Sequence, residues 1–223
     1  MAIQFLLDTA DPDQWKDWAS TGLFNGITTN PSLLRASNQL CNFKSLKELA
    51  LKAEDAGFKE LHLQAWGESP DDIAECGYAL GQLSTKSLNI HIKIPITQIG
   101  CKAAKELIQS NFSITFTACY AASQVLLAAA LKATYIAPYL GRMNDKKKNG
   151  LVEVTSMQKM LHGIDSKCKI LVASIRTMNE ITDLTIQGLS TFTISPKLAK
   201  EFFNVPETLE AARNFQEDAL KCI

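Results

Sequence analysis

Short apolar runs and amphipathic segments alternate along the whole chain. Segments with helical periodicity separate the apolar runs, and strands alternating with helices at spacings of about 20–35 residues indicate repeated βα units with a parallel sheet. Eight such units is the number that closes a (β/α)8 TIM barrel, and we expect this fold. The eight runs are rich in β-branched and aromatic residues and lie at 3–8, 26–29, 61–66, 89–96, 113–118, 134–140, 169–175 and 191–195.

Capping residues mark several of the expected helix boundaries. Asp11 followed by Pro12 predicts a helix start. Ser45 and Glu48 fit a capping box at the start of the next long helix. No linker or low-complexity segment divides the chain, so we treat 1–223 as a single domain. A doubly wound open sheet is the alternative, but the G-x-G-x-x-G turn that often accompanies it is missing from the sequence.

A lysine in the fourth run, IHIKIPIT, carries the main chemical signal. Strands of a parallel barrel are covered on both faces, and side chains alternate between them. Ile92 and Ile94 then face the helices, while His91, Lys93 and Pro95 face the barrel axis. Burial disfavours the charged form of an amine, and a neutral amine is a nucleophile that condenses with ketones. A lysine that only extends to the strand end is the alternative.

Other polar residues gather where the predicted strands end. Active sites of TIM barrels are built at this carboxyl-terminal end. A Schiff-base reaction needs an acid/base group, a positioned water and donors for substrate hydroxyls, and arginines suit a phosphate. The candidates of these types are Asp8, Asn30, Gln64, Thr117, Tyr139, Arg142, Ser174 and Arg176.

Composition narrows the class of protein. Lys+Arg and Asp+Glu both number 23, which argues against a general nucleic-acid or anionic-membrane binder. No apolar stretch of about 18 residues suits a membrane span, and the first residues do not resemble a signal peptide. The six cysteines show no C-x-x-C spacing and the three histidines complete no zinc pattern. We therefore expect a cytoplasmic protein with reduced thiols. We also expect no metal or organic cofactor, because the iminium of a Schiff base takes the place of a Lewis acid.

Motifs in a fixed order then point to a family. The sequence resembles the transaldolase family, and more closely its short branch that includes fructose-6-phosphate aldolase. Family members are (β/α)8 barrels, and the pair TTNPS and K-x-P-x-T is specific to them. The matching pieces are LDTAD (7–11), GITTNPSLL (26–34), IKIPIT (92–97), TACYAASQ (117–124), YIAPYLGR (135–142) and VASIRT (172–177).

The resemblance implies roles for individual residues. Lys93 matches the Schiff-base lysine, and Asp8 matches the acid/base aspartate. Asn30 matches the asparagine that binds substrate hydroxyls, with Thr29 beside it. The remaining implied contacts to the sugar phosphate are Ser174, Arg142 and Arg176.

Four further positions follow the aldolase branch. Gln64, Thr117 and Tyr139 match residues that hold a catalytic water there, and Ala137 stands where transaldolases tend to carry serine. The implied activity is cleavage of the C3–C4 bond of fructose 6-phosphate to dihydroxyacetone and glyceraldehyde 3-phosphate. The alternative is a transaldolase of the pentose phosphate pathway, which transfers the dihydroxyacetone unit from fructose or sedoheptulose phosphate to an aldose phosphate.

Several alternatives stay open from the sequence. His62 and His91 depart from related chains and are either paired core histidines or a proton relay to Lys93. Rival functions are a deoxyribose-phosphate aldolase, a sugar-phosphate isomerase and an inactive barrel kept as a binding module. A final helix near 206–220 has an apolar stripe that packs either on its own barrel or, as in the short branch, on a neighbouring subunit, which implies a homo-oligomer of pentamers or a decamer.

Overall fold

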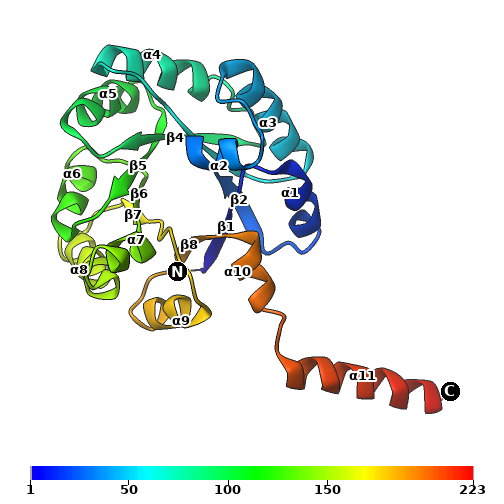
Figure 1. The fold of residues 1–223 in the computed structure, drawn as a ribbon. Helices are drawn as coiled ribbons and strands as arrows, with labels where there is room; N and C mark the ends of the chain where they lie inside the picture. Colours follow the sequence, from blue (N-terminus) through cyan, green and yellow to red (C-terminus); the bar gives the residue numbers. More distant parts are fainter. Residues whose placement is uncertain (1, 223) are drawn as a thin grey trace.

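Eight parallel strands form one sheet in the computed structural model, which describes residues 2–222 (Figure 1). Their order is β7-β6-β5-β4-β3-β2-β1-β8. Val172, just after β7, exchanges backbone hydrogen bonds with Thr191 and Thr193 of β8, so the two edges meet and the sheet closes. The predicted barrel is confirmed. The strands are β1 Gln4–Asp8, β2 Phe24–Thr28, β3 Glu60–Gln64, β4 Asn89–Pro95, β5 Ser113–Cys119, β6 Tyr135–Pro138, β7 Lys169–Ile170 and β8 Thr191–Ile194.

Helices surround the strands on the outside of the barrel (Figure 1). Most follow the predicted alternation, but α2 and α7 are short additional helices in the loops after β2 and β6. The helical segments are α1 Pro12–Ala19, α2 Pro31–Ala36, α3 Phe43–Asp55, α4 Pro70–Gly81, α5 Gln98–Gln109, the 3-10 turn η1 Ala122–Gln124, α6 Val125–Ala130, α7 Leu140–Asp145, α8 Gly150–Gly163, α9 Met178–Ile186, α10 Pro196–Glu201 and α11 Pro206–Lys221.

The helix caps test the sequence rules directly. Asp11 caps α1 as expected, because its side chain accepts a hydrogen bond from the amide of Asp13 at 3.1 Å. The capping box expected at Ser45 is wrong. Helix α3 begins at Phe43, and Asn42 is the cap, accepting from the Ser45 amide at 2.9 Å. Asparagine caps helices as well as serine does, and here the helix begins after Asn42, so that Ser45 lies in its first turn.

Side chains of the strands divide between two apolar layers, as the period of two predicts. Ile92 and Ile94 are fully buried in the large core between sheet and helices. A separate small cluster contains Leu6, Tyr135, Ala137, Leu171 and Ala173. Leu6 lies two positions before Asp8 and Ala137 two positions before Tyr139, so these residues share the interior face. The barrel interior is therefore packed, and the face of β4 that carries Lys93 lies inside it.

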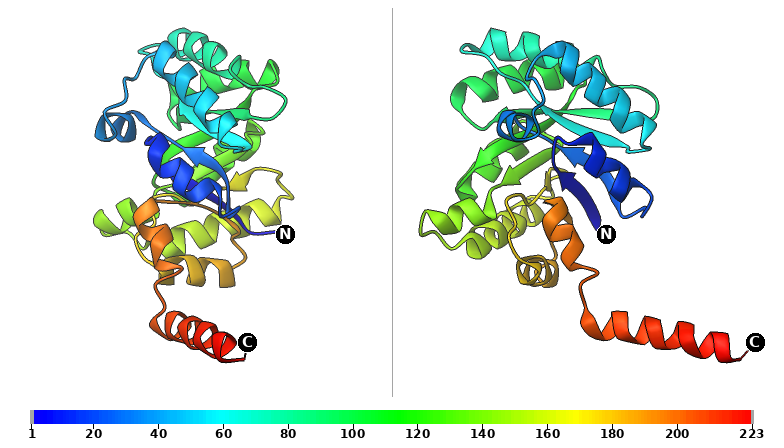
Figure 2. Two further views of the ribbon diagram at one scale, coloured as in Figure 1. Left: turned by 90° about the vertical axis from the view of Figure 1, so that its right-hand side faces the viewer. Right: turned by 45° about the vertical axis from the view of Figure 1, so that its right-hand side comes forward.

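The last helix, α11, leaves the barrel altogether (Figures 1 and 2). None of its residues is buried, so packing on its own barrel is wrong. Its apolar side chains Leu209, Phe215 and Leu220 are 50%, 73% and 63% exposed. Within residues 2–222, no helix has both the length and the hydropathy needed to span a bilayer.

Candidate active site

Lys93 lies in the barrel interior near the end of β4. Its side chain is buried, with 4% of the residue exposed. The ammonium nitrogen donates a hydrogen bond to the carbonyl oxygen of Thr29 at 2.7 Å. Burial lowers the pKa of Lys93 below its usual value, Asp8 opposes this shift, and Arg142 adds to it. The lysine is thus an amine that gives up its proton more readily than one in water.

The loop after β2 provides the carbonyl group that accepts the hydrogen bond from Lys93. Thr29 is fully buried, and both its amide and its hydroxyl donate to the carbonyl of His62, at 3.1 and 3.0 Å. Asn30 caps α2, accepting from the Leu33 amide at 3.0 Å through Oδ1. This bond fixes the orientation of the side chain and leaves its NH2 group as the end available to a ligand.

Asp8 ends β1 and accepts a hydrogen bond from Thr28, which is in turn bonded to Thr193. Thr28 of β2 donates to Asp8 Oδ1 at 2.7 Å. The Thr28 hydroxyl also lies 2.5 Å from that of Thr193 on β8, and Thr193 is the donor in that pair because the Thr28 proton is already used. The carboxylate is therefore fixed in position, and it is near enough to Lys93 to raise the pKa of the lysine.

The hydroxyl groups of Thr117 and Tyr139 contact each other in the barrel interior. Thr117 of β5 and Tyr139 after β6 are hydrogen bonded at 2.8 Å. Gln64 ends β3 directly beside Lys93 in the strand register, and Thr117 pairs with the second residue after the lysine. The Arg142 guanidinium lies over the Tyr139 ring, 4.7 Å from its centre, which is a cation–π contact. Arg142 therefore lies beside Tyr139, and it is near enough to Lys93 to lower the pKa of the lysine.

The loop after β7 supplies Ser174 and Arg176. Ser174 has a φ of +60°, a left-handed conformation that is strained for serine. Gly141 of α7 donates its amide to the Ser174 carbonyl at 2.9 Å, and a side chain at Gly141 would collide with that carbonyl. Arg176 forms a forked ion pair with Asp145, with one bond at 2.8 Å. Arg176 is thus directed at α7 and is half exposed.

The structure brings most of the predicted residues to one end of the barrel, where their strands finish. Comparison with known proteins identifies the family. A family model described as Transaldolase/Fructose-6-phosphate aldolase matches residues 5–222. The chain belongs to this transaldolase family.

Curated relatives cover nearly the whole chain. A protein of Chelativorans sp. (strain BNC1) named probable transaldolase is 31% identical over 227 residues, covering 98% of this chain and 97% of its own. A probable transaldolase of Phenylobacterium zucineum (strain HLK1) is also 31% identical, with the same coverage. The chain is thus a transaldolase-type enzyme. The relatives' names match the transferase alternative better than fructose-6-phosphate aldolase.

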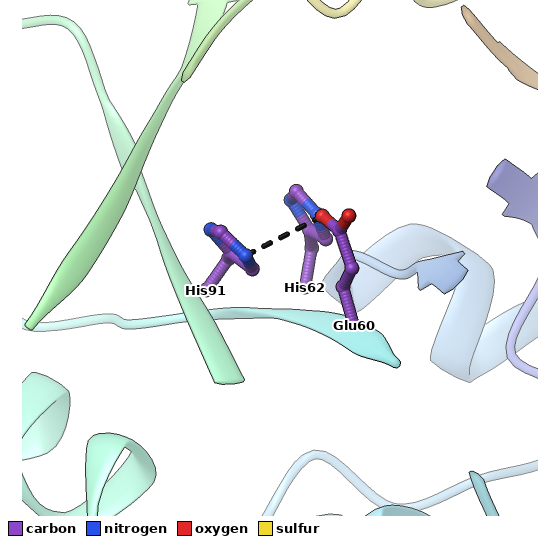
Figure 3. Close-up of side chains that lie close together, drawn as sticks. All are labelled: Glu60, His62 and His91. Atoms are coloured by element: carbon purple, nitrogen blue, oxygen red, sulfur yellow. Dashed lines mark hydrogen bonds and ion pairs between the residues drawn. The ribbon is translucent and has the colours of Figure 1, made fainter. Parts of the chain in front are cut away.

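Below the lysine, this transaldolase-family barrel has a polar layer (Figure 3). His62 and His91 stack with ring centres 4.5 Å apart, and both lie within 3.4 Å of Glu60 Oε2. Burial lowers the pKa of both histidines, that of His91 to about 3. They are therefore paired with each other and with a carboxylate. Whether they relay protons to Lys93 stays a hypothesis.

Sequence reasoning missed three residues that support the site. Thr28 fixes Asp8, Asp145 holds Arg176, and Glu60 completes the histidine pair. The period of two could have found Glu60, because it stands two positions before His62 and shares its face. No pattern linked Asp145 to an arginine 31 residues away.

Proposed function

We propose that this enzyme forms a Schiff base between Lys93 and a ketose phosphate and moves a three-carbon dihydroxyacetone unit. The observation that carries the proposal is the buried amine of Lys93 beside the carboxylate of Asp8. Burial favours the neutral nucleophile, and the nearby carboxylate can accept a proton. An isomerase would not need the lysine, and an inactive module would not keep both groups.

The reaction follows from these two groups. The neutral amine of Lys93 attacks the C2 carbonyl of fructose 6-phosphate, and loss of water gives an iminium ion. Asp8 accepts the proton of the C4 hydroxyl, the C3–C4 bond breaks and its electron pair moves to the iminium, which becomes an enamine. The aldehyde product, glyceraldehyde 3-phosphate, leaves. Asn30 and Ser174 are suited to hold the hydroxyls of the substrate.

Transfer is the first candidate for the fate of the enamine. It attacks the aldehyde of a second sugar phosphate, and hydrolysis of the new iminium releases a longer ketose and frees Lys93. The names of the relatives support this reading, since both are probable transaldolases.

Release of free dihydroxyacetone is the second candidate. The enamine is protonated and water then hydrolyses the iminium. The hydrogen-bonded pair of Thr117 and Tyr139, with Gln64 beside the lysine, supports this reading because these groups can orient an attacking water. Ala137, 2% exposed on β6, presents no hydroxyl of its own at this position.

Arg142 is the better placed of the two proposed phosphate ligands. It lies over Tyr139, close to the lysine, whereas Arg176 is engaged with Asp145. A phosphate recruits Arg176 by replacing the carboxylate in the fork, since guanidinium grips either anion with two bonds. Neither arginine needs a metal or an organic cofactor for this task.

The first test is covalent trapping. The enzyme is incubated with fructose 6-phosphate and sodium borohydride, digested and analysed by mass spectrometry. Reduction of the iminium should leave an adduct on the peptide that contains Lys93, and Lys93→Met should abolish it. An unmodified Lys93 in active enzyme rejects the mechanism.

A second test separates transfer from release. Fructose 6-phosphate is supplied with and without erythrose 4-phosphate, and free dihydroxyacetone is measured by enzymatic reduction. Turnover only with the acceptor supports the transferase. Release at the same rate without the acceptor supports the aldolase.

We propose that α11 docks on a neighbouring copy of the chain, in a pentamer or a decamer. Its exposed apolar residues Leu209, Phe215 and Leu220 support this, because isolated apolar patches of this kind usually mark interfaces. Deletion of 205–223 should shift the enzyme to a smaller species in analytical ultracentrifugation. A cytoplasmic location is part of the proposal and suits the six free cysteines.

A further inference from the structure

The polar layer at the amino-terminal end of the barrel contains groups that the proposed reaction does not use. Glu60, His62 and His91 come from the starts of β3 and β4, and they are all buried (Figure 3). His62 and His91 face the barrel interior two positions before Gln64 and Lys93 on their strands. We propose that these three residues bind a divalent transition-metal ion of the zinc type.

Two of the three distances between the ligand atoms, taken before His91 turns, are close to those around such an ion. His62 Nε2 lies 3.3 Å from Glu60 Oε2, and His91 Nε2 lies 3.4 Å from the same oxygen. Zinc–nitrogen and zinc–oxygen bonds of about 2.0–2.1 Å in a tetrahedron put ligand atoms about 3.3–3.4 Å apart. All three ligand atoms lie within 4.8 Å of one another. Two imidazoles and a carboxylate are a usual ligand set for zinc and its neighbours.

Outer hydrogen bonds orient two of the three ligands. Gln4 and Asn25 both donate to Oε1 of Glu60, which leaves Oε2 free to face the histidines. The Nδ1 atom of His62 is hydrogen bonded to the Thr115 hydroxyl at 3.0 Å, so Nε2 is the nitrogen directed at the carboxylate. Outer-shell bonds of this type fix the orientation of metal ligands.

Without an ion, the contacts of His91 conflict. Its Nε2 lies 3.0 Å from the Asn89 amide nitrogen and 3.4 Å from the Glu60 carboxylate. A protonated Nε2 faces a donor in Asn89, and an unprotonated Nε2 turns its lone pair towards an anion. The buried Nδ1 of His91 has no hydrogen-bond partner among the described residues. A cation between the nitrogen and the carboxylate removes the repulsion.

One ring has to move for the ion to bind. The lone pairs of imidazole lie in the ring plane, and the planes of His62 and His91 are within 13° of parallel. A single ion therefore requires His91 to turn about its Cβ–Cγ bond, a torsion with broad preferences. The turn replaces the 3.0 Å contact of Nε2 with Asn89 by the ion and breaks no bond at Nδ1. An ion can enter at the Glu60 end, where Asn89 is exposed.

The test is metal binding by the full-length chain, and it does not depend on catalytic activity. Protein stripped with a chelator is titrated with zinc chloride in competition with a chromophoric chelator, and thermal unfolding is followed with and without zinc. We expect one ion per chain and a higher Tm with zinc. Glu60→Gln and His91→Gln should each weaken binding by more than about tenfold.

His162→Ala is the matched control, because this histidine is exposed on α8 and should leave zinc binding unchanged. Absence of zinc binding in the parent chain, or equal binding by Glu60→Gln, overturns the proposal. If the variants do not fold, cobalt(II) absorption of the parent chain decides. Tetrahedral ligand-field bands without a thiolate charge-transfer band support the site, whereas a thiolate band or no band rejects it.

Discussion

Tyr139→Phe is the substitution that separates dihydroxyacetone release from transfer. It removes one hydroxyl, which lies 2.8 Å from that of Thr117, and keeps the ring over which Arg142 lies. If these hydroxyls orient the water that hydrolyses the iminium, release of free dihydroxyacetone should slow. Capture of the enamine by an acceptor aldehyde does not need that water, so formation of the new carbon–carbon bond in a single turnover should be affected less. The later hydrolysis of the new iminium uses the same water and should slow as well.

The structure gives the size of the expected effect. A single hydrogen bond to the attacking water contributes about 0.5–1.5 kcal/mol, which corresponds to a fall of about two- to twelvefold in the release rate. Thr117 is 1% exposed and its hydroxyl loses a partner, so the free energy of unfolding should fall by about 1–3 kcal/mol. The stability change is measured separately by urea denaturation.

The assay measures both outcomes on one enzyme preparation. Free dihydroxyacetone is followed without acceptor. Capture is followed in single turnovers with saturating erythrose 4-phosphate, as the borohydride-reduced adduct of the longer ketose on the Lys93 peptide. Thr117→Ser, which keeps a hydroxyl, serves as the control and should retain most of the release. An equal fall in both rates, or no fall in release, would refute the role of the pair in positioning water.

Three further outcomes follow from contacts in the site. Gly141→Ala should destabilise the fold by about 1–3 kcal/mol in chemical denaturation, because the new methyl meets a carbonyl oxygen of the loop after β7; an unchanged midpoint contradicts that close packing. Asp145→Asn should free Arg176 to bind phosphate and so lower the KM for a phosphorylated ketose severalfold in steady-state assays. A raised KM shows instead that the carboxylate positions the arginine. Since burial lowers the pKa of Lys93, borohydride trapping should rise with pH and reach half its maximum below pH 10.5, the usual pKa of a lysine. Asp8→Asn removes a charge that raises the pKa of Lys93, so the midpoint of trapping in this variant should lie at a still lower pH. A midpoint at higher pH contradicts the coupling between the two residues.

The interior face of the strands was predictable from the sequence because the period of two is a local property. Lys93 and His62 lie where alternation puts them, and Asp8 lies where the first strand ends. The same rule separated Ile92 and Ile94 into the outer core. Local geometry fixed these positions, and no distant contact was needed.

Features that depend on pairs distant in sequence were not predictable. The bond between Asp145 and Arg176 depends on α7, a helix of six residues that is too short to leave a periodic signal. Glu60 was missed because the apolar run in the sequence starts one residue after it, although the period of two could have included it. Its bonds to Gln4 and Asn25 depend on β3 lying beside β2 and β1 in the sheet, which the sequence does not state. Helix α11 has the expected bounds, but its amphipathic pattern does not show whether its apolar face packs on its own barrel or on another molecule.

The place where the barrel closes has a consequence for its motions. Strand β7 is two residues long, and an isolated bridge between Val172 and Phe192 links it to β8. This junction has a short pairing between strands, so amide hydrogens there should exchange with deuterium faster than those of β4 and β5. Local opening at this junction would shift the loop that carries Arg176. Lys93 would stay in place, because β4 is paired along its length with β3 and β5. The side of the site near β7 can therefore move while the side near β4 stays rigid.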